Sequence, residues 1–263
     1  MNLDLKGRSV LVTGGNRGVG LAIALGFAEE GANVAICGRD KAALAEAEAK
    51  IAAKGVKAKA VAVDLFTAAG CSGAVQAAVD AFGGLDVLVN NASTAIGGNI
   101  ETLDDDGLME RLQGKTLAYM RCCRAALPHL RKSSRGRVIC IGGTAARHIG
   151  PDALPSALGN SALTAFVSHF SRTVAAQGIT ANVVHPPFTK TDRYPKRLTA
   201  RTKLLGVSEK EAEASFVAQF PIGRIVEPAD IAPMVLFLAS PHASAITGQS
   251  IAVDGGSTPG INY

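Results

Sequence analysis

Short apolar runs rich in β-branched residues alternate with longer helical stretches along almost the whole chain. This alternation constrains the fold strongly, because strands joined through helices run parallel in one sheet. The runs are mostly continuous in apolar character, as in strands buried on both faces. We predict seven strands: Ser9–Thr13, Asn33–Cys37, Lys59–Val63, Asp86–Asn90, Arg137–Ile141, Thr180–Val184 and Ser250–Val253. We predict six helical segments: Gly18–Glu30, Lys41–Lys54, Gly70–Phe82, Leu103–Lys132, Leu154–Gln177 and Pro228–Ala239.

We therefore expect one doubly wound α/β domain over residues 1–263, with a seven-stranded parallel sheet and helices on both faces. No linker or internal repeat divides it. The segment 192–220 departs from the pattern because it is long, basic and rich in Lys, Arg and Glu. It follows the sixth predicted strand, on the side where open α/β sheets bind ligands. We predict that this segment is a mobile substrate lid carrying short helices.

The composition excludes several classes of protein. Apolar residues make up 48% and charged residues 19% of the chain, as in ordinary globular domains. No apolar run approaches about 18 residues, which excludes a membrane span, and the first residues lack the apolar core of a secretory signal. The five cysteines form no C-x-x-C pair, which indicates reduced thiols. We expect a cytoplasmic protein with neither a metal site nor a membrane partner.

The net charge is +5 at pH 7, and the positive excess lies in two clusters. Neither cluster is interleaved with aromatic residues, so we expect no nucleic-acid partner. The first is interpreted as a solvated helix end, and the second as either a solvated loop or a site for an anionic substrate. The first contains Arg121, Arg124, Arg131, Lys132, Arg135 and Arg137, and the second Lys190, Arg193, Lys196, Arg197, Arg201 and Lys203.

A glycine-rich turn follows the first predicted strand and opens a helix. Gly14 permits the tight turn, Gly18 lets the backbone approach a pyrophosphate, and Gly20 lets the helix pack close to the sheet. The helix N-terminus directs amide donors and the positive end of its dipole at phosphates. This strand–turn–helix context predicts a dinucleotide site that includes Gly14, Asn16, Arg17, Gly18, Val19 and Gly20.

The end of the second predicted strand discriminates between the two nicotinamide cofactors. A site for NAD(H) usually has a carboxylate there for the ribose 2′-hydroxyl, whereas an arginine suits a 2′-phosphate. In this chain Cys37 occupies the strand end and Arg39 lies just beyond it, with Arg17 in the glycine turn. Two guanidinium groups favour NADP(H) over NAD(H). The alternative is that Arg39 is merely solvated and Asp40 caps the next helix.

Several segments, taken in order and spacing, resemble the short-chain dehydrogenase/reductase family over nearly the full length. They are Thr13–Gly20, Asp64-Leu65, Asn90-Asn91-Ala92, Pro186 with Thr191, Gly223-Arg224, Thr247-Gly248-Gln249 and Val253-Asp254-Gly255-Gly256. The resemblance implies a Rossmann fold with strand order 3-2-1-4-5-6-7, a small-molecule substrate and a homotetramer. It also implies cofactor contacts from Asp64, Leu65, Asn91 and Ala92 on the adenosine side, and from Pro186, Thr189 and Thr191 on the nicotinamide side.

The resemblance breaks down at the catalytic positions. Reductases of the family use a serine to polarise the carbonyl, a tyrosine to transfer the proton, and a lysine one turn on to lower the phenol pKa, usually with an asparagine. By position, Gly143 replaces the serine, Ser156 the tyrosine, Asn160 the lysine and Lys115 the asparagine. The three tyrosines, Tyr119, Tyr194 and Tyr263, form no Tyr-x-x-x-Lys motif.

Lys115 and Asn160 look like an exchange between facing helices, which would keep a cationic amine near the nicotinamide ribose. The candidates to replace the missing proton donor are Lys115, His148, Tyr194, Thr144 and water. Three readings stay open. The chain is an NADP(H)-dependent oxidoreductase with an atypical acid/base, a catalytically silent NADP(H)-binding sensor or partner subunit, or a non-redox lyase, isomerase or dehydratase on the same fold.

Overall fold

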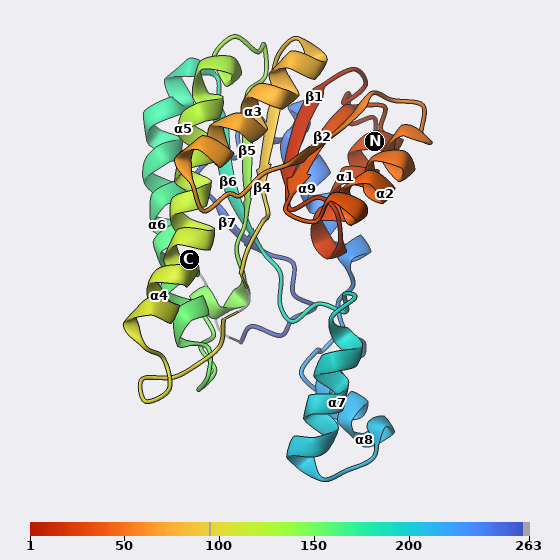
Figure 1. Cartoon of the computed structure of the whole chain (residues 1–263), viewed down its shortest axis with the longest axis vertical. Coiled ribbons are helices and arrows are strands. Elements are labelled where there is room, and N and C mark those ends of the chain that lie inside the picture. The colour runs from red at the N-terminus through yellow and green to blue at the C-terminus, as the bar shows by residue number, and fades with distance from the viewer. Residues whose placement is uncertain (95, 260–263) are drawn as a thin grey trace.

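A seven-stranded parallel sheet forms the centre of the protein in a computed structural model that describes residues 1–94 and 96–259 (Figure 1). The strand order is β3-β2-β1-β4-β5-β6-β7, and every neighbouring pair is parallel. This confirms the predicted fold class and strand order. The strands are β1 (Ser9–Thr13), β2 (Asn33–Gly38), β3 (Ala58–Ala62), β4 (Val87–Asn90), β5 (Arg137–Ile141), β6 (Thr180–His185) and β7 (Ser250–Ala252).

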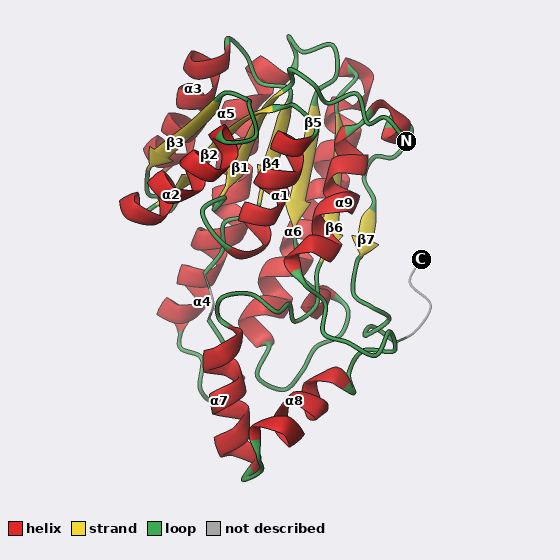
Figure 2. Ribbon diagram, turned by 90° about the vertical axis from the view of Figure 1, so that its right-hand side faces the viewer, coloured by secondary structure: helices red, strands yellow, loops and turns green. Residues whose placement is uncertain are grey.

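Helices cover both faces of the sheet (Figure 2). Successive strand residues point to opposite faces, so Val10 and Val12 pack into one apolar cluster while Leu11 packs into the other. The first cluster includes α1 (Gly18–Glu29), α2 (Lys41–Ala52) and α9 (Pro228–Ala239). The second includes α3 (Ala68–Phe82), α5 (Ala118–Leu130) and α6 (Leu154–Val174). Both faces are therefore buried, as the continuous apolar runs predicted.

The predicted long helix over 103–132 is interrupted. It consists of α4 (Asp105–Leu112), a π-helical turn over Gln113–Leu117, and α5. Gly114 lies in the turn with no room for a side chain, because a Cβ atom there would stand 2.7 Å from the Phe66 ring and 2.9 Å from the Thr94 methyl group. Such single π turns inside helices often occur at functional sites. Here the turn carries Lys115.

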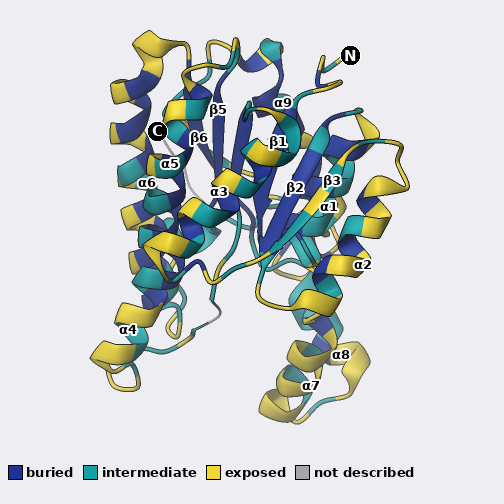
Figure 3. Cartoon of the chain, turned by 45° about the horizontal axis from the view of Figure 1, so that its top comes forward, coloured by how far each residue is buried: buried dark blue, intermediate teal, exposed yellow. Residues whose placement is uncertain are grey.

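The segment after β6 holds α7 (Tyr194–Leu205) and α8 (Glu209–Val217), which extend beyond the carboxyl ends of the strands (Figure 1). Most of their surface is exposed, in contrast to the buried strands (Figure 3). A small aromatic cluster joins the two helices to the loop before them, with the rings of Phe188 and Phe216 stacked at 4.7 Å and Tyr194 beside both. The short helices expected in 192–220 are present. Within the described residues, no helix is long and apolar enough to span a membrane.

Candidate functional site

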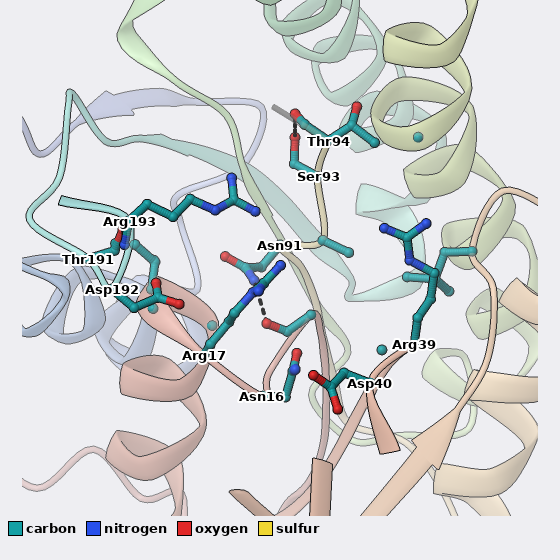
Figure 4. A pocket seen from close by; sticks show the side chains of 18 of the residues that line it. Asn16, Arg17, Arg39, Asp40, Asn91, Ser93, Thr94, Thr191, Asp192 and Arg193 are labelled. Carbon is teal, nitrogen blue, oxygen red and sulfur yellow. Dashed lines mark hydrogen bonds between the residues drawn. The ribbon is translucent and has the colours of Figure 1, made fainter. Parts of the chain in front are cut away.

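A cavity of about 650 Å³ opens at the carboxyl ends of the strands, where open α/β sheets place their ligands (Figure 4). Its size is typical of small-molecule and cofactor sites. All of the predicted cofactor residues except Pro186 line it: Gly14, Asn16, Arg17, Gly18, Val19, Gly20, Arg39, Asp64, Leu65, Asn91, Ala92, Thr189 and Thr191. Pro186 is buried next to the lining residue Pro187, and its carbonyl accepts a hydrogen bond from the Thr144 amide.

The glycine turn has the geometry of a phosphate cradle. Gly14 and Gly18 have φ values of +64° and +54°, a backbone region that glycine adopts without strain. A Cβ atom on Gly20 would overlap the Gly14 carbonyl and the Asn91 amide. Asn91, directly after the neighbouring strand β4, fixes the turn, because its Nδ2 donates to the carbonyl oxygens of Thr13 at 2.9 Å and Gly14 at 3.1 Å. The turn can therefore pack this closely against Asn91 and Ala92 only because Gly14 and Gly20 lack side chains.

Two exposed arginines line the cavity beyond the cradle. Figure 4 shows Arg17 and Arg39 on either side of Asn16 and Asp40. Asp40 is committed to its own helix, since its carboxylate accepts from the Ala43 amide at 3.1 Å as the N-cap of α2. β2 ends at Gly38, one residue later than predicted, and the preceding Cys37 is fully buried, so neither residue offers a side-chain hydrogen-bonding group to a ribose. The geometry thus combines the two sequence alternatives, because Asp40 is a cap and Arg39 still lines the cavity.

Lys115 is held inside the protein. It is 3% exposed, and its Nζ donates to the Gly142 carbonyl at 2.9 Å, just past the end of β5. Burial holds the pKa of the Lys115 amine well below its ordinary value, and the nearby Arg111 charge lowers it further. Lys115 therefore pairs with a backbone carbonyl, and it does not line the cavity.

Asn160 lies against Gly143, a contact that the sequence analysis did not predict. It is 2% exposed on α6, and its Oδ1 has no hydrogen-bond partner among the described residues. A Cβ atom on Gly143 would stand 2.8 Å from Asn160 Nδ2. The asparagine amide therefore occupies space that a side chain at 143 would need. Ser156 is half-buried in the first turn of α6, and none of Gly143, Ser156, Asn160 and Lys115 lines the cavity.

The other proton-donor candidates are scattered. His148 is exposed in the loop after β5. The hydroxyl of Tyr194 donates to Glu213 at 2.9 Å, and burial together with this carboxylate raises the pKa of Tyr194 to about 12. Tyr119 is buried and donates to the Ile141 carbonyl at 3.2 Å. Tyr263 lies outside the described residues.

The sequence interpretation missed His185, which lies behind the catalytic loop. Its Nδ1 lies 2.9 Å from the Gly143 carbonyl oxygen and 3.1 Å from the Gly143 amide nitrogen, and its Nε2 lies 2.8 Å from the Ser250 hydroxyl. Burial lowers the pKa of His185 to about 4, so the ring is neutral at physiological pH. His185 ends β6 in the middle of an apolar run, and no sequence signal distinguished it from a core residue.

Comparison with known proteins decides the family. The family model described as enoyl-(acyl carrier protein) reductase matches residues 14–258. The chain belongs to the short-chain dehydrogenase/reductase family. This agrees with the strand order, the glycine cradle and the position of the cavity.

Relatives and solved structures of this family match nearly the whole chain. A 3-oxoacyl-[acyl-carrier-protein] reductase of Vibrio cholerae is 31% identical over 254 residues, which covers 97% of this chain and 98% of the relative. L-sorbose reductase of Gluconobacter frateurii, solved with NADPH and L-sorbose, superposes with a TM-score of 0.93 at 29% identity, over 99% of this chain and 100% of that one. A short-chain dehydrogenase of Burkholderia cenocepacia in complex with NADP superposes with a TM-score of 0.86 at 31% identity, over 97% and 99% of the chains.

The cavity of this short-chain dehydrogenase/reductase also contains residues that the motifs did not single out. Arg193 and Arg197, from the basic cluster after β6, line it beside Thr191. Ser93 and Thr94 line it on the far side, where the buried Arg111 donates to the Ser93 hydroxyl at 2.8 Å and to the Thr94 carbonyl. The basic cluster in the sequence was the signal that could have identified Arg193 and Arg197. The contacts of Arg111 with Ser93 and Thr94 form only because α4 packs against the loop after β4, and the sequence does not show this packing.

Proposed function

We propose that this short-chain dehydrogenase/reductase is an NADP(H)-dependent oxidoreductase whose catalytic centre lacks the phenol–ammonium pair of its family. One observation carries the cofactor assignment: Arg17 and Arg39 both line the cavity where β2 ends, and the last two residues of β2, the buried Cys37 and Gly38, carry no carboxylate. Guanidinium groups bind phosphate with charge-assisted, often paired hydrogen bonds. Neither arginine forms an ion pair within the described part of the chain, and a 2′-phosphate would supply a counter-charge for both.

The residues of the cavity fit this cofactor. The glycine cradle and the N-terminus of α1 suit a pyrophosphate, since Gly18 begins the helix and lines the cavity, and Gly14 and Gly20 allow the turn to pack closely below it. Asp64, Leu65 and Ala92 line the adenosine side, and Thr189 and Thr191 line the side toward α7. When bound, the cofactor supplies the hydride, and the chain supplies position and electrostatics.

At the reacting end, we propose that Lys115 and Asn160 act on the substrate oxygen in place of the usual serine and tyrosine. Asn160 Nδ2 lies 2.8 Å from the position that a Cβ atom on Gly143 would take, which supports a role for it as a neutral hydrogen-bond donor in place of the family's serine. The Lys115 amine reaches the same loop through Gly142. Both groups would stabilise negative charge on a substrate oxygen that reaches the loop at Gly142 and Gly143, whereas Ser156 is too weak an acid to replace a phenol. Standard ketone reduction is therefore expected to be slow.

A second function has a specific observation in its favour. The four catalytic positions are buried or half-buried, and none of them lines the cavity. A chain that binds NADP(H) without turnover, as a sensor or as a partner subunit, would keep the cradle and lose access to these groups.

Calorimetric titration with NADPH and NADH tests the cofactor assignment. NADPH should bind more tightly, and Arg39→Ala should reduce the preference without abolishing NADH binding. The exposed Arg124→Ala on α5 is the matched control, because Arg124 lies outside the cavity lining. Equal affinities of the wild type for the two nucleotides would sink the assignment. NADPH oxidation with 3-oxoacyl thioesters and ketoses, the substrate classes of the relatives, then separates a slow enzyme from a silent binder.

A further inference from the structure

A second cavity, of about 420 Å³, lies at the amino-terminal ends of the strands, where β5 and β6 begin, whereas the first cavity lies at their carboxyl ends. Two guanidinium side chains and several hydroxyl side chains line it, and no carboxylate does. The lining residues are Ser134, Arg135, Arg137, Ala175, Gly178, Ile179, Thr180, Pro241, Ser244 and Thr247. This composition is that of a site for an anion.

Arg137 is the central group of this cavity. It is only 4% exposed, at the first position of β5. Its Nη1 donates to the carbonyl oxygens of Gly136 at 2.9 Å and Gly178 at 3.5 Å. Its Nε is buried and has no partner among the described residues. A buried guanidinium with an unpaired donor is costly, because it loses the hydrogen bonds that water would provide.

The charges around Arg137 are not balanced within the described part of the chain. Arg8 pairs with Asp86 at 3.4 Å, and Arg135 pairs with Asp4 at 2.7 Å. No carboxylate lies within ion-pairing distance of Arg137 among residues 1–94 and 96–259. Burial lowers the pKa of Arg137 to about 10, and the charges of Arg135 and Arg8 add to the effect.

A purely structural role accounts for part of this arrangement. Gly178 follows the last turn of the α6 segment, so its carbonyl carries part of the negative end of the helix dipole. This explains the Nη1 contacts of Arg137 but not the unpaired Nε or the cavity beside it. Capping of this helix end by Arg137 also does not require the hydroxyl side chains that line the cavity, which belong to Ser134, Thr180, Ser244 and Thr247. The Ser134 hydroxyl already accepts from Arg8 at 3.2 Å, which places a third arginine next to the cavity.

We propose that this cavity binds a small oxyanion of the phosphate class, held by Arg137 and Arg135 and by the hydroxyl groups of Ser134, Ser244 and Thr247. The site is separate from the cofactor cavity and does not depend on the proposed activity. Its anion neutralises Arg137 and joins the starts of β5 and β6 to the loop before β7.

Thermal unfolding in inorganic phosphate, against chloride of equal ionic strength, tests this proposal. Phosphate should raise Tm by about 2–4 °C, because a ligand that binds only the folded chain stabilises it. Ser244→Glu should remove this response by placing a carboxylate in the cavity, whereas the neutral Ser244→Gln should retain most of it. Arg137→Gln should also remove it. If Arg137→Gln does not fold, the comparison between the two variants at Ser244 still decides.

Arg39→Ala is the control for phosphate bound in the cofactor cavity. This variant should keep the full rise in Tm, since Arg39 lies in the cavity at the carboxyl ends of the strands. A response lost in Arg39→Ala and kept in Ser244→Glu would assign the phosphate to the cofactor cavity and overturn the proposal. A response of equal size in all variants would reflect general salt effects on the folded state and would overturn it too.

Discussion

Adding a methyl group at Gly143 should destabilise the protein, because Asn160 already fills the adjacent space. The Cβ atom of Gly143→Ala would stand 2.8 Å from Asn160 Nδ2, closer than real Cβ contacts allow. Asn160 is 2% exposed, so its amide cannot swing into solvent. The backbone at Gly143 is extended, with φ of 174°, and adds no strain of its own. The free energy of unfolding should therefore fall by about 1–3 kcal/mol, the usual cost of overpacking.

A double-mutant cycle isolates this contact. Asn160→Ala removes the amide whose Oδ1 has no partner, so the double variant should recover most of the loss. The expected coupling is about 1–2 kcal/mol, within the range for touching residues. Urea unfolding of the four proteins measures it. Gly150→Ala, in the loop that follows, is the matched control, because nothing lies within 4 Å of its Cβ position; it should be neutral or slightly stabilising.

Additive effects of Gly143→Ala and Asn160→Ala, within about 0.5 kcal/mol, would refute this reasoning. They would mean that Asn160 moves aside freely and does not occupy the position of the family's serine. A coupled result has a practical consequence for restoring the family's catalytic groups. Gly143→Ser would then be tolerated only together with a change at Asn160, alongside Ser156→Tyr and Asn160→Lys.

Three further outcomes are expected. Lys115→Met should lower kcat for NADPH oxidation about ten- to a thousandfold, the scale for losing one electrostatic donor, with NADPH affinity nearly unchanged by calorimetry; an unchanged kcat would remove Lys115 from the mechanism. The pKa of His185 is lowered from 6.5 to about 4 in the folded protein, so the unfolded chain binds this proton more readily. The free energy of unfolding should therefore fall by up to about 3 kcal/mol as the pH drops from 6.5 to 4. Urea unfolding across this pH range should show a flatter profile for His185→Gln, whereas His148→Gln, at an exposed position, should leave the profile unchanged. Light scattering should give a tetramer, and a 26.9 kDa monomer at micromolar concentration would contradict this expectation.

The local pattern of the chain was enough for most of the fold. Continuous apolar runs between helical stretches predicted seven buried parallel strands, and the structure places every one within a residue or two of its expected bounds. The glycine turn between β1 and α1 was equally readable, because its spacing reflects backbone geometry within a few residues. The break at Gln113–Leu117 was not readable, since it depends on how Phe66 and Thr94, from distant loops, approach Gly114.

The sequence by itself determined the family, the sheet and the cradle, because each depends on residues close together in the chain or on a pattern repeated along it. Only the tertiary structure decided what surrounds the catalytic positions. It pairs Lys115 with the Gly142 carbonyl, sets Asn160 against Gly143 and leaves all of them outside the cavity lining. It also leaves Arg137 buried beside a second cavity without a carboxylate. Burial and the pairing of charges depend on segments that meet only after folding, so no local pattern records them.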